Sequence, residues 1–235
     1  MLDEANPVVQ FKLALLETVM PAESAAVFGD MWVVEGGYAA RCAEHGCRRV
    51  LLVDTFETAG WLERRAADHR LDFYKANFSN PFFMASVNER FSVSVAFDVL
   101  LHQAPLLSTI HAILEKTADA IVIAQPVLRE QPMANSLVYL PGQAAASELY
   151  PFAPAGPRGF DVLDVNTAHW IWGMTPSFIR AVLAGEGFEV EHEASGGDCP
   201  SPHWFWWGCV ARRGADNPRH WSRSTPSPGV IEPNW

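Results

Sequence analysis

The chain has 235 residues, of which 49% are hydrophobic and 19% charged, and its formal net charge is -10. This composition supports a buried core and excludes bulk disorder, and the negative charge disfavours phosphate backbones and anionic membranes, so we expect no nucleic-acid or membrane partner. Cys42, Cys47, Cys199 and Cys209 are too few and too scattered for a disulfide framework. Because no signal-peptide pattern or membrane-length apolar run is present, we expect a cytoplasmic protein.

Short apolar runs alternate with segments of helical spacing in the first half of the chain. An opening helix is expected over residues 10–20, where Pro21 ends it. The expected strands are residues 25–30, 49–54, 71–75, 93–101 and 119–124. The expected helices are residues 36–45, 56–68, 81–90 and a fourth with Leu106, Leu107, Ile110, Ile113 and Leu114 on one face. Strands that alternate with helices in this way predict crossover connections and a parallel sheet.

The alternation stops after Gln125. Residues 126–172 are rich in proline and have no regular pattern. A segment of this length inside a compact domain is typical of a lid, so we expect it to close over a bound ligand. Thr175 and Pro176 then suit the N-cap and the first position of a new helix.

Two different strands are expected near the C-terminus. Residues 188–191 alternate between apolar and acidic side chains, whereas residues 204–211 are almost wholly apolar. A short polar region joins them, which predicts an antiparallel pair with the last strand beside the fifth strand and the alternating strand outside it. Residues 213–235 are rich in proline and serine and are expected to form a surface tail.

This order of elements resembles the fold of class I S-adenosylmethionine (SAM)-dependent methyltransferases over residues 25–212, with residues 1–24 as an N-terminal helical segment. The resemblance implies an α/β fold with a doubly wound, Rossmann-like sheet. Five parallel strands and a C-terminal antiparallel pair would give seven strands, with helices on both faces.

The first motif of that family is an acid after strand one followed by spaced glycines, D-x-G-x-G-x-G. Asp30 and Gly36 match the acid and the last glycine, Gly37 follows, and Trp32 and Val34 replace the other two glycines. Because glycine lets the backbone approach a ligand closely, we expect this loop to follow a different path or the methionine end of SAM to be held differently. Gly36 and Gly37 still open a helix, whose free N–H groups can meet a carboxylate.

The resemblance implies further cofactor contacts at two positions, after strands two and three. Asp54 would accept hydrogen bonds from the two ribose hydroxyls, with Thr55 and Phe56 beside the adenine. Asn77 would accept from the adenine amino group, and Phe78 would cover the ring. Asp54 and Asn77 also fit simpler roles, as the cap of a helix and of a turn.

The end of strand four, where the family keeps the methyl group and the acceptor, reads Leu101-His102-Gln103. We expect Leu101 to contact the cofactor and Gln103 the substrate. His102 is the first candidate for a general base, because a neutral imidazole can take a proton from a hydroxyl; its alternative is a structural role beside the core or the lid. His169, where the insertion rejoins the domain, is the second catalytic candidate.

Tyr150, Trp170 and Trp172 are expected to line the acceptor pocket. Aromatic faces attract a sulfonium cation by about 0.5–2 kcal/mol. The alternative is that these side chains pack the insertion against the sheet. No metal site is expected, because the histidines and cysteines near the C-terminus match no zinc spacing.

The sequence therefore predicts SAM-dependent methyl transfer to a small-molecule acceptor, with O-methylation ahead of N-methylation and a homodimer left open. One alternative is a catalytically inactive binding or regulatory protein on the same fold, suggested by Trp32 and Val34. The other is a nicotinamide-dependent oxidoreductase, because Asp54 would suit that ribose too. The second alternative is weaker, since no G-x-G-x-x-G follows strand one.

Overall fold

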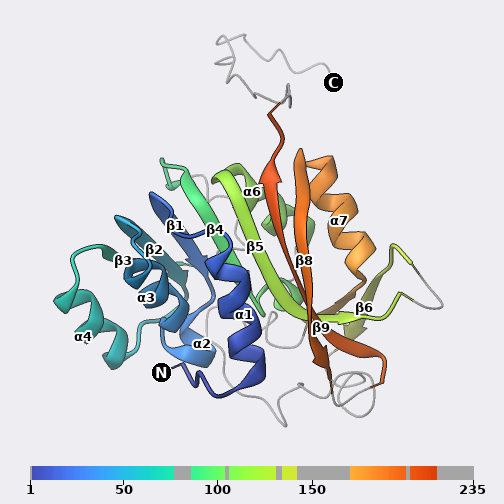
Figure 1. The fold of residues 1–235 in the computed structure, drawn as a ribbon, viewed down its shortest axis with the longest axis horizontal. Coiled ribbons are helices and arrows are strands. Elements are labelled where there is room, and N and C mark those ends of the chain that lie inside the picture. Colours follow the sequence, from blue (N-terminus) through green and yellow to red (C-terminus); the bar gives the residue numbers. More distant parts are fainter. Residues whose placement is uncertain are drawn as a thin grey trace, which may run out of the picture.

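A twisted seven-stranded sheet forms the centre of the molecule (Figure 1). The computed structural model describes residues 2–76, 86–103, 106–130, 134–141, 170–199 and 202–215. The sheet order is β3-β2-β1-β4-β5-β9-β8. Its parallel strands are β1 (Ser24–Phe28), β2 (Arg49–Asp54), β3 (Leu71–Lys75), β4 (Phe91–Phe97) and β5 (Thr117–Leu128), and its antiparallel strands are β8 (Phe188–Asp198) and β9 (Trp204–Arg213).

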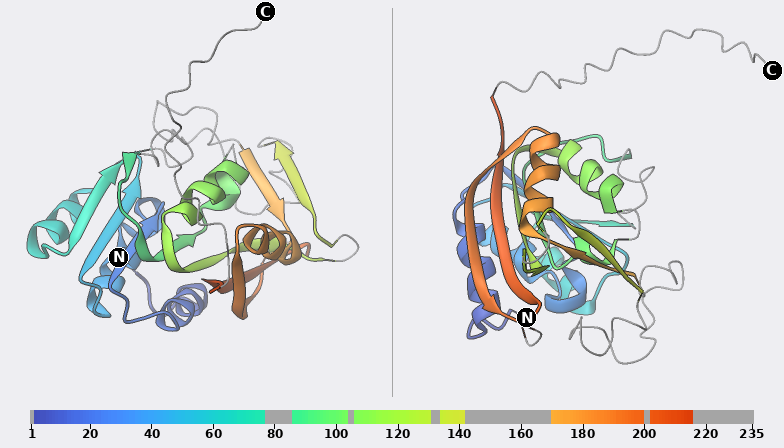
Figure 2. Two further views of the ribbon diagram at one scale, coloured as in Figure 1. Left: turned by 90° about the horizontal axis from the view of Figure 1, so that it is seen from above. Right: turned by 90° about the vertical axis from the view of Figure 1, so that its right-hand side faces the viewer.

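Helices cover both faces of this sheet, as the edge-on view in Figure 2 shows. One face packs against α1 (Pro7–Glu17), α3 (Gly37–Glu44) and α4 (Ala59–Ala67), and the other against α6 (Leu106–Glu115) and α7 (Pro176–Gly185). In β2, Val50 and Leu52 face the first layer while Leu51 and Val53 face the second. Burial on both faces is why the parallel strands read as continuous apolar runs.

The N-terminal helix α1 is part of the core rather than an appendage. Leu15 and Leu16 are 1% and 0% exposed. A Cβ atom added to Gly208 in β9 would lie 2.4 Å from the Leu15 side chain, so the glycine allows α1 to lie directly on the strand. Asn6 caps the helix by accepting a hydrogen bond from the Val8 N–H.

The closing strands confirm the predicted topology. The apolar strand β9 lies between β5 and the alternating strand β8, with both pairings antiparallel. Thr175 caps α7 by accepting from the Phe178 N–H, and Pro176 takes the first helical position, as expected.

The strand count differs from the prediction, because a separate two-stranded sheet lies within the expected irregular insertion. This sheet pairs β6 (Leu137–Pro141) with β7 (Trp170–Met174). The fifth strand also continues past Gln125 to Leu128, because these residues pair with the start of β9. Most of the insertion and residues 216–235 of the tail lie outside the described residues.

Strand four is shorter than predicted. The sequence suggests a strand over residues 93–101, but β4 ends at Phe97, and Leu100–His102 form the short 3-10 helix η1. Of the helix expected over 81–90, only residues 86–90 are described, and 87–90 are not helical. In the described ranges, no helix is both long and apolar enough to cross a membrane.

Candidate functional site

The sheet order places a topological switch point at the carboxyl ends of β1 and β4. The chain runs outward from β1 through β2 to β3, then returns to β4 on the opposite side of β1 and continues to β5. Ligands of doubly wound sheets bind outside the carboxyl ends of the strands at such a switch point. An acidic residue follows or ends each nearby strand: Asp30 after β1, Asp98 after β4, and Asp54 at the end of β2.

Asp54 is held in place by backbone amides. It is 6% exposed; its Oδ2 accepts from the Met31 N–H at 2.9 Å and its Oδ1 from the Thr55 N–H at 2.7 Å. Oδ1 also accepts from the Thr55 hydroxyl at 3.4 Å, so Oδ2 is the oxygen that keeps a lone pair for a ligand hydroxyl. Burial raises the pKa of Asp54 above its usual value, and these amide hydrogen bonds oppose the rise.

Asp30 lies beside Asp54 and is more strongly perturbed. It is 5% exposed, and its Oδ2 accepts from the Ala39 N–H at 2.9 Å in the first turn of α3. Its Oδ1 is buried and has no hydrogen-bond partner in the described part of the chain. Burial raises the pKa of Asp30 to about 8, and the neighbouring charge of Asp54 contributes to the rise. At neutral pH Asp30 is therefore mostly protonated and can donate a hydrogen bond.

The segment between Asp30 and Gly36 takes a different path from a glycine loop. Met31–Val34 form the short helix α2, in which Trp32 and Val34 occupy helical backbone positions and need no glycine. The positive φ angles fall instead at Glu35 and Gly36, at 51° and 74°. The expectation of an altered loop path is met by this helical turn.

Side chains of the protein itself pack against both glycines of this motif. A Cβ atom at Gly36 would lie 2.3 Å from Cε3 of Trp61, which is fully buried, and one at Gly37 would lie 2.6 Å from Cγ of Leu2. The close approach that glycine allows is thus used for internal packing.

Asp98 is the functional candidate that the sequence analysis missed. It directly follows β4, has a φ angle of 57°, and forms an ion pair through Oδ2 with Lys12 of α1. The Lys12 ammonium lies 4.8 Å from the ring centre of Trp206, 5.8 Å from Tyr38 and 5.9 Å from Phe97. The signal in the sequence is an acid at the end of an apolar strand, as at Asp54.

The neighbouring part of the edge is neutral. Trp172 of β7 donates from Nε1 to the Gln103 carbonyl at 2.8 Å, which joins the two predicted substrate residues. Gln103 is 8% exposed and donates from its amide to the Val99 carbonyl. His102 is half-buried, and burial lowers its pKa to about 4, so the imidazole is neutral at physiological pH.

The remaining predicted residues are divided between the core and undescribed segments. Leu101 is 1% exposed in the apolar layer with α6, and Thr55 and Phe56 are half-buried beside Asp54. Trp170 begins β7, but its side chain is not described. Outside the described residues lie Asn77, Phe78, Tyr150 and His169. Within the described ranges, no three histidine, cysteine or acidic side chains are grouped for a metal ion.

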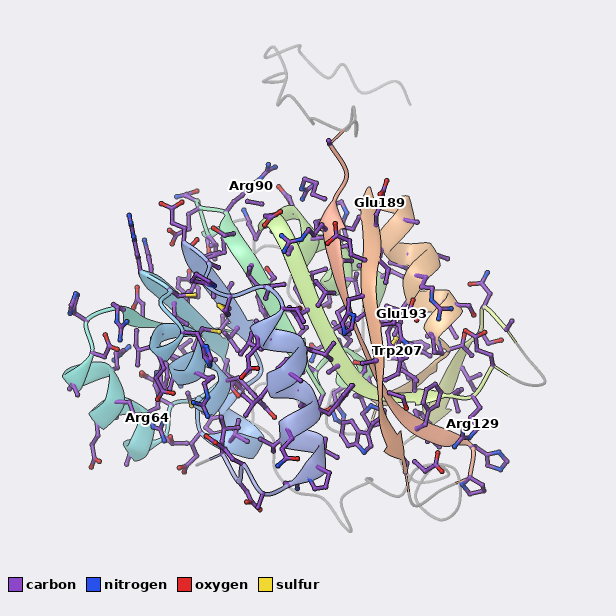
Figure 3. The ribbon with its side chains drawn as sticks, viewed as in Figure 1. Arg64, Arg90, Arg129, Glu189, Glu193 and Trp207 are labelled. Atoms are coloured by element: carbon purple, nitrogen blue, oxygen red, sulfur yellow. The ribbon has the colours of Figure 1, made fainter. Side chains whose placement is uncertain are left out.

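A cavity of about 330 Å³ lies apart from the switch point, between α7 and the β8–β9 hairpin. Arg180 donates to both carboxylate oxygens of Glu193, at 2.5 and 2.6 Å, and Trp207 donates to the same carboxylate at 3.3 Å. Figure 3 labels Glu193 and Trp207 next to each other on this hairpin. Because these polar groups bind one another, we assign the cavity no ligand.

Solved structures with the same architecture are SAM-dependent methyltransferases and a related cyclase. 1,6-Didemethyltoxoflavin-N1-methyltransferase of Burkholderia thailandensis, with its substrate and S-adenosylhomocysteine (SAH) bound, is 16% identical, with a TM-score of 0.58 over 90% of this chain and 79% of that chain. The N-terminal domain of EvdMO1 with SAH bound is 15% identical, with a TM-score of 0.60 over 91% of this chain and 85% of that chain. The chain has the class I methyltransferase fold.

The methyltransferase fold is shared more widely than the methyl-transfer reaction. The [4+2]-cyclase SpnF is 12% identical, with a TM-score of 0.59 over 87% of this chain and 80% of that chain. No protein-family model matches the chain, and neither does any curated protein. At these identities the fold is shared, and the function depends on the site.

Proposed function

We propose that this protein binds SAM at the switch point and transfers its methyl group to a small-molecule acceptor. The observation that carries the proposal is the convergence of Asp30, Asp54 and Asp98 at the carboxyl ends of β1, β2 and β4. Two solved proteins of this fold hold SAH, and one of them also holds 1,6-didemethyltoxoflavin.

The acidic residues fit a nucleoside that carries a cationic substituent. Asp54 is fixed by two amides; one ribose hydroxyl can donate to Oδ2, and the other can take the place of the Thr55 hydroxyl, which lies 3.4 Å from Oδ1. The buried Oδ1 atoms of Asp30 and Asp98 lack partners in the described chain, which is unusual unless a ligand or water satisfies them. Gly36 and Gly37 do not take part, since Trp61 and Leu2 pack against them.

SAM, when bound, supplies a methyl group on a positively charged sulfur for in-line displacement by a nucleophile. The chain would provide orientation through Asp54 and a water-poor acceptor wall through Trp172 and η1. His102, neutral at physiological pH, would accept the proton of an acceptor hydroxyl, and for this reason we place O-methylation ahead of N-methylation. Its low pKa makes it a weak base, which suits an acidic hydroxyl such as a phenol.

Calorimetric titration with SAM tests the proposal. The wild type should bind one SAM per chain, and Asp54→Asn should bind it at least about tenfold more weakly, because a charge-assisted hydrogen bond contributes about 1.5–3 kcal/mol. Asp72→Asn is the matched control, since Asp72 lies on the neighbouring strand β3 and its side chain is 55% exposed. Absence of binding by the wild type, or equal binding by Asp54→Asn, would contradict the proposal.

A binding protein without methyl transfer is the second candidate, favoured by the packing of Trp61 against Gly36. It predicts that titration with SAM gives neither heat nor thermal stabilisation. Binding of a nicotinamide dinucleotide in place of SAM would support the oxidoreductase alternative instead.

A further inference from the structure

The ion pair between Lys12 and Asp98 lies at the switch point itself. Asp98 follows β4, one of the two strands at the switch point, and Lys12 reaches it from α1 on the face of the sheet. The Lys12 side chain is 5% exposed and the Asp98 side chain 21%. The lysine is therefore the more deeply buried partner, and the exposed part of Asp98 does not include Oδ1, which is buried.

The described side chains around Lys12 hold its ammonium in place. Its ammonium lies within 6 Å of the ring centres of Tyr38, Phe97 and Trp206, and these rings favour a cation at this point. The helix that carries it cannot withdraw without unpacking Leu15 and Leu16 from the core. Lys12 is thus held in place behind Asp98.

Only one of the two carboxylate oxygens of Asp98 has a hydrogen-bond partner in the described part of the chain. Oδ2 binds Lys12, whereas Oδ1 is buried without a hydrogen-bond partner in the described part of the chain. Its left-handed backbone conformation, with a φ of 57°, is uncommon for a residue other than glycine. Strained, unsatisfied positions of this kind are concentrated at ligand sites.

The charges at the switch point favour a cation. Three acidic residues, Asp30, Asp54 and Asp98, lie here with one described cation, Lys12. Burial raises the pKa of all three acids, and the Lys12 charge opposes the rise at Asp98. Acidic groups therefore outnumber the described cations in a water-poor environment, where charges interact more strongly than in bulk water.

We propose that Asp98 recognises the cationic centre of the ligand and makes the protein bind SAM, a sulfonium, more tightly than SAH, a neutral thioether. Lys12 acts through Asp98 as a positioning residue: it orients the carboxylate and leaves Oδ1 for the ligand. The inference rests on the proposed function, since it requires that SAM binds here. It adds that release of the product is favoured by the loss of its charge.

Competitive calorimetry with three ligands tests the inference: SAM, SAH, and sinefungin, which carries a protonated amine in place of the sulfonium. The wild type should prefer SAM and sinefungin to SAH by about tenfold, the size of a charge-assisted contact. Asp98→Asn, which keeps the shape of the side chain, should lose this preference through weaker binding of SAM and sinefungin, with SAH affinity nearly unchanged. Lys12→Met should also reduce the preference for SAM and sinefungin over SAH. A loss of packing alone would weaken the binding of all three ligands and leave this preference unchanged.

Asp119→Asn is the control, because Asp119 is an exposed acid of the same sheet, paired with Arg212. It should bind all three ligands as the wild type does. If the wild type binds SAM and SAH equally, or if Asp98→Asn weakens both alike, the inference fails while the proposed function stands. If the wild type binds none of the three, the proposed function fails and the inference with it. The wild-type comparison of sinefungin with SAH decides the case even if a variant does not fold.

Discussion

The carboxyl edge of the sheet has two contrasting halves. The charged half, at the ends of β1, β2 and β4, holds Asp30, Asp54 and Asp98 with Lys12 behind them. The neutral half, formed by η1 and β7, presents His102 with a pKa of about 4 and the hydrogen bond between Trp172 and Gln103. A ligand at the switch point would have its charged groups on one side and an uncharged wall on the other.

This contrast suits methyl transfer from a cation. The charged half can hold a sulfonium ligand by complementary charge, whereas the described side chains of the neutral half that are named above carry no charge. A reaction that disperses the charge of the sulfonium is favoured where water is excluded. In the proposed function, binding belongs to the ends of β1, β2 and β4 and the chemistry to η1 and β7, so each half can be altered separately.

The largest expected effect comes from a substitution at Gly36, the glycine of the charged half against which Trp61 packs. Gly36→Ala places a methyl group 2.3 Å from the Trp61 ring at a φ of 74°. We expect a loss of about 2–4 kcal/mol in the free energy of unfolding, measured by denaturant titration. Gly185→Ala is the matched control, since nothing lies within 4 Å of its added Cβ, and it should change stability by less than about 1 kcal/mol. If Gly36→Ala leaves the free energy of unfolding unchanged, the Trp61 ring is able to move away from residue 36.

The neutral half is tested next by His102→Gln. If His102 is the general base, turnover should fall by about a hundredfold while the dissociation constant of SAM stays within about twofold. Since burial lowers the pKa of His102 to about 4, the wild-type turnover should not lose activity near the ordinary histidine value of 6.5 as the pH falls. Unchanged turnover in the variant would remove His102 as the base.

A smaller effect is expected from Asp30, through the pH dependence of stability. Its folded pKa of about 8 lies above the ordinary aspartate value of 3.8, so the folded state binds more protons between these values and stability falls as the pH rises. Asp30→Asn should remove this slope, by about 2–3 kcal/mol between about pH 5 and pH 7 in thermal unfolding. The same slope in both proteins would show that Asp30 is ionised in the folded state.

The smallest expected effect is at the contact between β7 and η1. Trp172→Phe removes the hydrogen bond to the Gln103 carbonyl but keeps an aromatic ring, and should cost about 1 kcal/mol of stability. SAM affinity should not change, because the charged half is untouched. A marked loss of SAM affinity would show that the two halves are not independent.

The regular part of the fold is predictable because its pattern is local. Arg49–Asp54 reads as a buried strand with an acid at its end, and that is what β2 and Asp54 are. The alternating side chains of β8 likewise indicate a strand at the edge of the sheet, and the apolar side chains of β9 indicate an inner strand.

The site was harder to predict, because contacts between distant residues determine it. Asp98 was missed because the apolar residues Val99–Leu101 after it extend the strand pattern, although they are buried in a different element. Lys12 is 86 residues away from Asp98 in the sequence, and no local pattern joins them. The spacing of the glycines likewise does not predict that Trp61 packs against Gly36.

A crystal structure of the protein grown with SAM would show where the cofactor binds. We expect the nucleoside outside the carboxyl ends of β1 and β4, with the ribose hydroxyls on Asp54 and the sulfonium side of the ligand towards Asp98. A switch point that stays closed by Trp61, Leu2 and α2, with SAM absent or bound elsewhere, would contradict this expectation.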